Sequence, residues 1–290
     1  MDKLKNIHRF ERTMKQSEEQ WILNVSDVHY DSKNCDRKLL KKHFDLAKER
    51  GAWIIINGDW FDMMGCKRDP RSIPNDIRPE YMKAGASYLD LVIEDSYEFL
   101  KKYKDNIKLI SYGNHETNIV RRMEVDVFKW LHQLLSASGS EVELGAYQGA
   151  IIFKFTRENT NARHTSKWFY HHGAGGGAKR SKGILNADIL VSQNSWADVI
   201  TSGHDHNKWH LPFETRQLNE STMSWDKRRI EILRTGSYKK KSKEFGWEIE
   251  KDFNEPTLGG WWVKYKFIRI PSDNKDGRKL ILSKTVEEAK

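Results

Sequence analysis

The sequence predicts an α/β fold, because short apolar runs suited to buried strands alternate with amphipathic helical patterns. Residues 54–56 are three consecutive isoleucines with no polar alternation, which is typical of a strand buried on both faces. Residues 21–25 predict a strand before them. Asp36 is a suitable N-cap for a helix between the two strands, and Gly51 ends that helix.

The rest of the chain continues this alternation up to about residue 201. We expect strands at 107–112, 141–155, 167–172 and 198–201, and helices at 81–104, 118–135 and 181–191. Residues 209–213, 228–236 and 261–270 predict a second sheet. Because neither a repeat nor a linker interrupts the pattern, we predict one domain at 21–270. Residues 1–20 are expected to form a short surface helix or a frayed N-terminal arm, and 271–290 a polar C-terminal tail.

Composition indicates a soluble, basic protein. The 290 residues carry a net charge of +9 and are 38% hydrophobic, with a mean hydropathy of −0.78. No apolar run approaches the ~20 residues that span a bilayer, so no membrane partner is expected. The N-terminus lacks a secretory apolar stretch, and two cysteines cannot build a disulfide framework, which favours the cytoplasm. The positive charge favours a polyanionic partner.

Five turns rich in Asp, Asn and His each follow an apolar run, where strands of an α/β sheet present ligands. They are Asp27-Val28-His29, Gly58-Asp59, Gly113-Asn114-His115-Glu116, His171-His172-Gly173 and Gly203-His204-Asp205-His206. Any one turn alone has a simpler explanation, such as Asn114 capping a helix. Together they predict a metal centre, and their imidazole and carboxylate groups suit Mn, Fe, Zn or Ni.

These blocks resemble the calcineurin-like metallophosphoesterase superfamily, whose pattern is D-x-H, GD-x-x-D, GNH-D/E, H-G and GH-x-H. The resemblance covers about residues 22–206. It implies a four-layer fold with two packed mixed β-sheets flanked by α-helices. It also implies two divalent metal ions, with Mn expected first and Fe, Zn, Ni or Mg as alternatives.

The resemblance also implies roles for individual residues. One ion would be held by Asp27, His29, Asp59 and His206, and the other by Asp59, Asn114, His172 and His204. His172 is preferred over His171 because the family's ligand directly precedes the glycine, which leaves His171 as a supporting residue. Asp62 completes GD-x-x-D and would orient the site. His115 corresponds to the family's catalytic histidine.

The expected activity is phosphodiester hydrolysis of DNA or RNA by metal-activated hydroxide. Lys179, Arg180 and Lys182 either hold a substrate phosphate or belong to a solvated loop. The cluster of Lys239–Lys241 and Lys243, with Tyr238, Phe245 and Trp247 nearby, is typical of a nucleic-acid-binding patch.

The sequence leaves other activities open. One alternative is a small-molecule phosphatase or cyclic-nucleotide phosphodiesterase, and another is a nucleic-acid-binding module without turnover. The block GDWFDMM lacks the arginine of serine/threonine protein phosphatases, which argues against protein dephosphorylation. GDWFD is also similar to the block of lipid-precursor pyrophosphatases, although no amphipathic membrane helix supports that activity.

Overall fold

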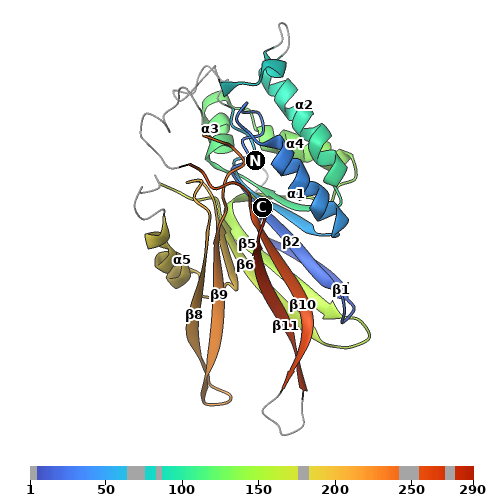
Figure 1. Cartoon of the computed structure of the whole chain (residues 1–290), viewed down its shortest axis with the longest axis vertical. Helices are drawn as coiled ribbons and strands as arrows, with labels where there is room; N and C mark the ends of the chain where they lie inside the picture. The colour runs from blue at the N-terminus through green and yellow to red at the C-terminus, as the bar shows by residue number, and fades with distance from the viewer. Residues whose placement is uncertain (1–4, 64–75, 83–86, 176–182, 242–254, 272–277) are drawn as a thin grey trace.

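The computed structural model describes residues 5–63, 76–82, 87–175, 183–241, 255–271 and 278–290. Within these residues, eleven strands form one mixed, curled sheet, and five α-helices lie against it (Figure 1). The expected α/β class is therefore confirmed. The strand order is β11-β10-β2-β3-β4-β5-β6-β7-β9-β8, and β1 pairs with β5 outside this path.

The regular elements have the following bounds. The strands are β1 Lys5–Met14, β2 Glu19–Val25, β3 Trp53–Asn57, β4 Ile107–Ser111, β5 Glu143–Arg157, β6 Arg163–His171, β7 Val199–Ser202, β8 Trp209–Asn219, β9 Ser224–Arg234, β10 Trp261–Pro271 and β11 Arg278–Glu288. The α-helices are α1 Arg37–Glu49, α2 Tyr88–Leu100, α3 Asn114–Met123, α4 Val127–Ala137 and α5 Ala187–Gln193. Short 3-10 turns occupy Pro79–Tyr81, Lys101–Tyr103 and Ile184–Asn186.

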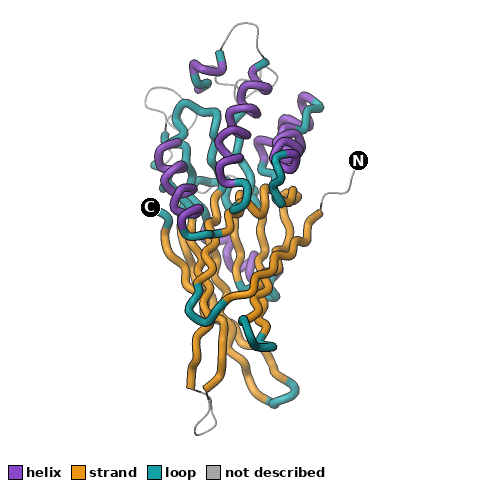
Figure 2. Tube along the Cα trace, turned by 90° about the vertical axis from the view of Figure 1, so that its right-hand side faces the viewer, coloured by secondary structure: helices purple, strands orange, loops and turns teal. Residues whose placement is uncertain are grey.

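Alternating side chains of the central strands build an inner core inside the curled sheet and two cores on its outer faces, one under α1, α2 and α4 and a smaller one under α5. In β3, Ile54 and Ile56 face the core shared with α1, α2 and α4, whereas Ile55 faces the inside of the curled sheet. In β7, Val199 joins the inner core and Ile200 packs with α5 on the outer face. The curled sheet thus forms two facing halves. The layers are, in order, helices α1–α4, the half of the sheet that they cover, the other half, and helix α5. The helices α1–α4 gather at one end of the molecule, and the long strands extend away from them (Figures 1 and 2).

The inner core is closed by contacts between strands that are distant in the sheet. Asn24 of β2 donates a hydrogen bond to Thr201 of β7. The Nε1 of Trp168 in β6 donates to the hydroxyl of Tyr265 in β10 over 2.8 Å. These contacts hold the two half-sheets face to face, so the turns that follow their strands can meet.

Strand β5 connects the two half-sheets. Its first residues pair in parallel with β4, and its later residues pair antiparallel with β6. The pairing with β1 skips from Gly145 to Ala150, which marks a bend in β5. The two packed sheets that the resemblance implies are the facing halves of one curled sheet, because the hydrogen bonds run on through β4, β5 and β6.

Helix α1 begins as the sequence predicts. The side chain of Asp36 accepts a hydrogen bond from the backbone N–H of Leu39 over 3.0 Å, which caps the helix. The expected helix at 118–135 is wrong in one respect, because it consists of α3 and α4. The break lies at Glu124, whose φ of 58° is left-handed and cannot continue an α-helix.

Both terminal segments differ from the expectation. Residues 5–14 form β1, which pairs in parallel with β5, so the predicted surface helix or frayed arm is wrong. Residues 278–288 form β11, which pairs along its whole length with β10, so this part of the predicted polar tail is a sheet strand. Both strands contribute to the inner core, because Met14 of β1 is fully buried there and Leu280, Leu282 and Val286 of β11 pack against it. None of the described helices combines the length and apolar character needed to cross a membrane.

The central isoleucine of β3 is expected to dominate local stability. Ile55→Ala would leave a cavity in the inner core, where Ile55 is fully buried, and lower the free energy of unfolding by about 2–5 kcal/mol. Urea denaturation measures this change. Ile7→Ala in β1 is the control, because Ile7 is 60% exposed and should change stability by less than about 0.5 kcal/mol. Equal losses in the two variants would contradict the assigned layers.

Candidate metal centre

Six of the predicted ligands lie on sharp turns that follow strands, and the seventh, Asn114, is the first residue of α3. The described chain has nine non-glycine residues with positive φ, and five of them are predicted ligands. These five are Asp27 (51°), His29 (49°), Asp59 (50°), His204 (81°) and His206 (56°). Left-handed backbone is unfavourable for such residues and persists where the surrounding structure enforces it, often at functional sites.

Two motif glycines let neighbouring turns approach these carboxylates. A Cβ added at Gly113 would lie 2.1 Å from Oδ1 of Asp59. A Cβ added at Gly203 would lie 2.3 Å from Oδ2 of Asp27. Neither position has room for a side chain. The glycines of GNH and GH-x-H are therefore required by packing against the acidic residues of the first two motifs.

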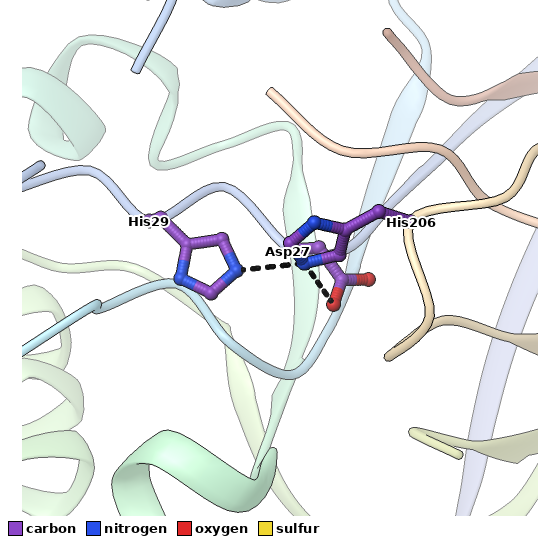
Figure 3. A group of neighbouring side chains, drawn as sticks. All are labelled: Asp27, His29 and His206. Carbon is purple, nitrogen blue, oxygen red and sulfur yellow. Dashed lines mark hydrogen bonds and ion pairs between the residues drawn. The ribbon is translucent and has the colours of Figure 1, made fainter. Parts of the chain in front are cut away.

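One candidate ligand cluster consists of Asp27, His29 and His206 (Figure 3). The Nε2 atoms of the two histidines lie 3.1 Å apart, and the Nε2 of His206 lies 3.5 Å from Oδ1 of Asp27. Asp27 is fully buried, and the backbone N–H of His204 lies 3.0 Å from both of its carboxylate oxygens and is shared between them. The cluster joins the turn after β2 to the turn after β7.

A second candidate cluster consists of Asp59, His172 and His204. The Nε2 of His172 lies 3.1 Å from Oδ2 of Asp59. The side-chain oxygen of Asn114 lies 3.1 Å from that same nitrogen and 2.7 Å from Nδ1 of His204. This cluster brings together the turns after β3, β4, β6 and β7.

The two clusters adjoin one another. The Nε2 of His172 in the second lies 4.0 Å from Oδ1 of Asp27 in the first. The backbone carbonyl of Asp59 accepts hydrogen bonds from Val28 and His29, over 2.8 and 3.1 Å, which ties the first two motif turns together. The structure therefore gathers all seven predicted ligands into one region. The sharing of Asp59 between two ions stays a prediction.

The electrostatics of the second cluster favour added positive charge. Burial opposes protonation of His172, but the Asp59 and Asp27 carboxylates outweigh it and raise the pKa of His172 to about 10. Burial alone would raise the pKa of Asp59, yet its histidine neighbours hold it well below the usual range. A proton on His172 thus supplies the charge that a divalent ion would supply, and the donor set fits such an ion.

The predicted supporting residues have distinct positions. Oδ1 of Asp62 lies 2.8 Å from Nδ1 of His29, which suits a group that orients the imidazole. The ring of His171 packs edge-on against Tyr147, and burial lowers the pKa of His171 to about 4. His171 does not belong to any candidate metal cluster among the described residues.

His115 lies beside both clusters. Its Nδ1 is 2.6 Å from the backbone carbonyl oxygen of Asp62, and its Nε2 is 3.9 Å from Oδ2 of Asp59. The backbone N–H of His115 donates to Oδ1 of Asp59 over 2.9 Å. The contact at Nδ1 fixes the ring so that Nε2 is directed toward the centre.

Glu116 has a structural role that its position in GNHE did not reveal. This fully buried carboxylate accepts hydrogen bonds from the backbone N–H groups of Asp59, Phe61 and Gly113, over 2.9–3.1 Å. Burial and the charge of Asp59 raise the pKa of Glu116 to about 7. Glu116 therefore holds the second and third motif turns together.

Arg234 at the end of β9 was also missed. Its Nη1 donates to the carbonyl of Gly203 over 2.7 Å and lies 3.2 Å from Oδ2 of Asp205. Asp205 separates His204 from His206, so Arg234 fixes the turn that supplies one histidine to each cluster. Arg234 is the last residue of β9, next to the buried Ile232 and Leu233, but no motif singles it out.

The structure gives no support for the residues that were predicted to bind substrate. Lys179, Arg180 and Lys182 lie outside the described residues. In the proposed basic patch, Lys239 is largely buried and forms ion pairs with Asp62 and Asp76, and Lys240 pairs with Asp36. The expectation of an exposed cationic patch is therefore wrong for Lys239, because its ammonium group is paired with two buried carboxylates.

Comparison with known proteins identifies the family. The calcineurin-like phosphoesterase family matches residues 21–208, so the chain belongs to this family and is a metal-dependent phosphoester hydrolase. No curated protein matches it in sequence.

Two solved structures were also found to be similar. One is an uncharacterized predicted phosphoesterase from Streptococcus pneumoniae, with 13% identity, 91% of this chain and 98% of that chain covered, and a TM-score of 0.32. The other is GAP50, the anchor in the inner membrane complex of Plasmodium, with 13% identity, 94% and 89% covered, and a TM-score of 0.44. At such low identities, neither neighbour specifies a substrate for this chain.

Metal binding at neutral pH is expected to release a proton from His172. Because its pKa is near 10, His172 is protonated at pH 7 and must become neutral before it can bind an ion. Mn²⁺ affinity should therefore rise with pH until His172 is deprotonated. Calorimetric titration in buffers with different ionisation enthalpies counts the protons. His171→Ala should leave that count unchanged, and a titration without proton release would contradict the assignment.

Proposed function

We propose that the chain is a dinuclear metal-dependent phosphodiesterase that hydrolyses DNA or RNA. The observation that carries the dinuclear centre is the adjacency of two buried His/Asp clusters, which approach to 4.0 Å between His172 and Asp27. Two divalent ions there would neutralise phosphate charge and lower the pKa of a bound water. Asp27, His29, Asp59 and His206 would hold one ion, and Asp59, Asn114, His172 and His204 the other.

His115 is the proposed general acid. Its Nδ1 contact with the carbonyl of Asp62 is best made as an N–H donor, and a protonated ring then carries a second proton on Nε2. That proton is on the side of Asp59, where the phosphoester would be bound. Transfer from Nε2 to the departing oxygen would avoid the release of an alkoxide.

Charge and the surface of the β8–β9 hairpin support a nucleic-acid substrate. The chain carries a net charge of +9. Arg216 lies directly opposite Lys227, and both are exposed. Trp225, which is 63% exposed, lies two residues before Lys227 on the same face. Glu214 lies opposite Arg229 on this face too, two residues away from the Arg216–Lys227 pair. Cations beside an exposed indole can contact a phosphate backbone and stack a base.

The role of His115 is tested by replacing it and comparing the fall in kcat on substrates with different leaving groups. His115→Asn should lower kcat on a DNA phosphodiester by about 10²–10⁴-fold, because a sugar alkoxide needs a proton. The loss on bis-p-nitrophenyl phosphate should be smaller, since nitrophenolate leaves without one. Steady-state kinetics with Mn²⁺ measures both. His132→Asn, at a histidine that contacts Val142, is the control and should change neither rate. Equal losses on both substrates would contradict the proposal.

The substrate class is tested by a panel of single- and double-stranded DNA, RNA, cyclic nucleotides and mononucleotides. We expect degradation of a nucleic acid that weakens steeply as salt increases, because bound phosphates release counterions. Turnover of small nucleotides with DNA and RNA left intact would reject the nucleic-acid substrate. Salt-dependent binding of nucleic acid without its hydrolysis would reject the proposed enzymatic activity.

The hairpin offers a control that leaves the metal centre untouched. Trp225→Ala with Lys227→Ala should weaken nucleic-acid binding and reduce its salt dependence, while hydrolysis of bis-p-nitrophenyl phosphate stays unchanged. Met223→Ala, at a residue 86% exposed near the hairpin tip, should change neither quantity.

A further inference from the structure

Lys239 is a largely buried cation next to the candidate metal centre. Its side chain is 11% exposed. Its Nζ lies 3.0 and 3.2 Å from the two carboxylate oxygens of Asp62, and 2.6 Å from Oδ2 of Asp76. Both carboxylates are themselves buried. The ammonium group thus lies between two acidic side chains that would otherwise be buried side by side.

The backbone around Lys239 is fixed against the first ligand turn. The backbone N–H of Tyr238 and the hydroxyl of Ser237 both donate to the carbonyl of Asp27, over 3.0 and 2.9 Å. The backbone N–H of Lys239 donates to the Ser237 hydroxyl over 2.9 Å. The segment after β9 therefore brings Lys239 to the centre together with Asp27.

Asp62 connects Lys239 to a predicted ligand. Its Oδ1 lies 2.8 Å from Nδ1 of His29, while the Nε2 of His29 faces His206. The Asp62 backbone N–H donates to Asp31 over 2.6 Å, which fixes the main chain but leaves the side chain to be oriented by its own contacts. Such contacts to a histidine ligand set the direction of its metal-binding nitrogen.

We infer that Lys239 is a positioning residue, which holds the Asp62 carboxylate against Nδ1 of His29 and so directs Nε2 of His29 toward the metal ion. This inference rests on the dinuclear centre of the proposed function. His29, Asp62 and His115 also form a third group whose geometry suits a cation. The ammonium of Lys239 supplies positive charge to Asp62 there, so the acidic side chain needs no further ion.

The consequence of removing the charge follows from burial. Without the ammonium, the Asp62 and Asp76 carboxylates would face each other with no cation between them, which is strongly unfavourable for buried charges. Asp62 would turn away from Asp76 and lose its alignment with His29. A purely electrostatic role predicts the opposite sign, because a cation near the centre repels metal ions and its removal would strengthen their binding.

The test is a Mn²⁺ titration of the full chain, with free Mn²⁺ measured by electron paramagnetic resonance. Wild type should bind two ions. Lys239→Met should weaken at least one of them by about 10–100-fold, the range found when partners of metal ligands are removed. Lys240→Met is the matched control, because Lys240 is 58% exposed and pairs with Asp36 at the surface. It should bind Mn²⁺ as wild type does.

A double-mutant cycle distinguishes positioning from a general loss of structure. Asp62→Asn should weaken binding of the same Mn²⁺ ion. The double variant Asp62→Asn with Lys239→Met should bind that ion no more weakly than the weaker-binding single variant. Additive losses would overturn the inference. Lys239→Gln, which keeps a hydrogen-bond donor but not the charge, provides a second variant if Lys239→Met does not fold, and it should also weaken Mn²⁺ binding.

The outcomes separate this inference from the proposed function. Unchanged or tighter Mn²⁺ binding in the Lys239 variants, with two ions in wild type, would overturn the role of Lys239 alone. A wild type that binds no Mn²⁺, or one ion, would overturn the dinuclear centre itself.

Discussion

The structure depends on the burial of negative charge at one edge of the sheet. Asp27, Asp59 and Asp62 are nearly inaccessible to solvent, and Glu116 beside them is fully buried. Isolated carboxylates are too costly to bury, so each must meet a cation or several donors. Glu116 meets three backbone N–H groups, Asp62 meets Lys239, and Asp27 with Asp59 faces the histidines. The last group is where divalent ions would complete the charge balance.

The fold makes this arrangement possible by curling one sheet into two facing halves. The segments after β2, β3 and β4 supply the carboxylates, His29 and Asn114 from one half, and those after β6 and β7 supply the other histidines from the second half. Contacts such as Asn24 with Thr201 close the inner core directly below the centre. The same strands therefore carry the apolar residues that stabilise the fold and the turns that carry the chemistry.

Much of the site was predictable because its residues follow strands that read clearly as apolar runs. The fold was less predictable near the ends of the chain: β1 and β11 mix apolar and charged residues, and their conformation comes from pairing with β5 and β10. Lys239 shows why a charge run is ambiguous. Its three neighbouring lysines predict a surface, and only the tertiary placement of Asp62 and Asp76 reveals a buried ion pair.

The central claim is that two divalent ions bind on either side of Asp59. A crystal structure of the protein with Mn²⁺, with anomalous difference maps at the manganese edge, tests it most directly. The account predicts two peaks about 3.5–4 Å apart, with the Asp59 carboxylate between them. A single peak, or peaks away from the turns that carry Asp59, His172 and His206, would contradict it.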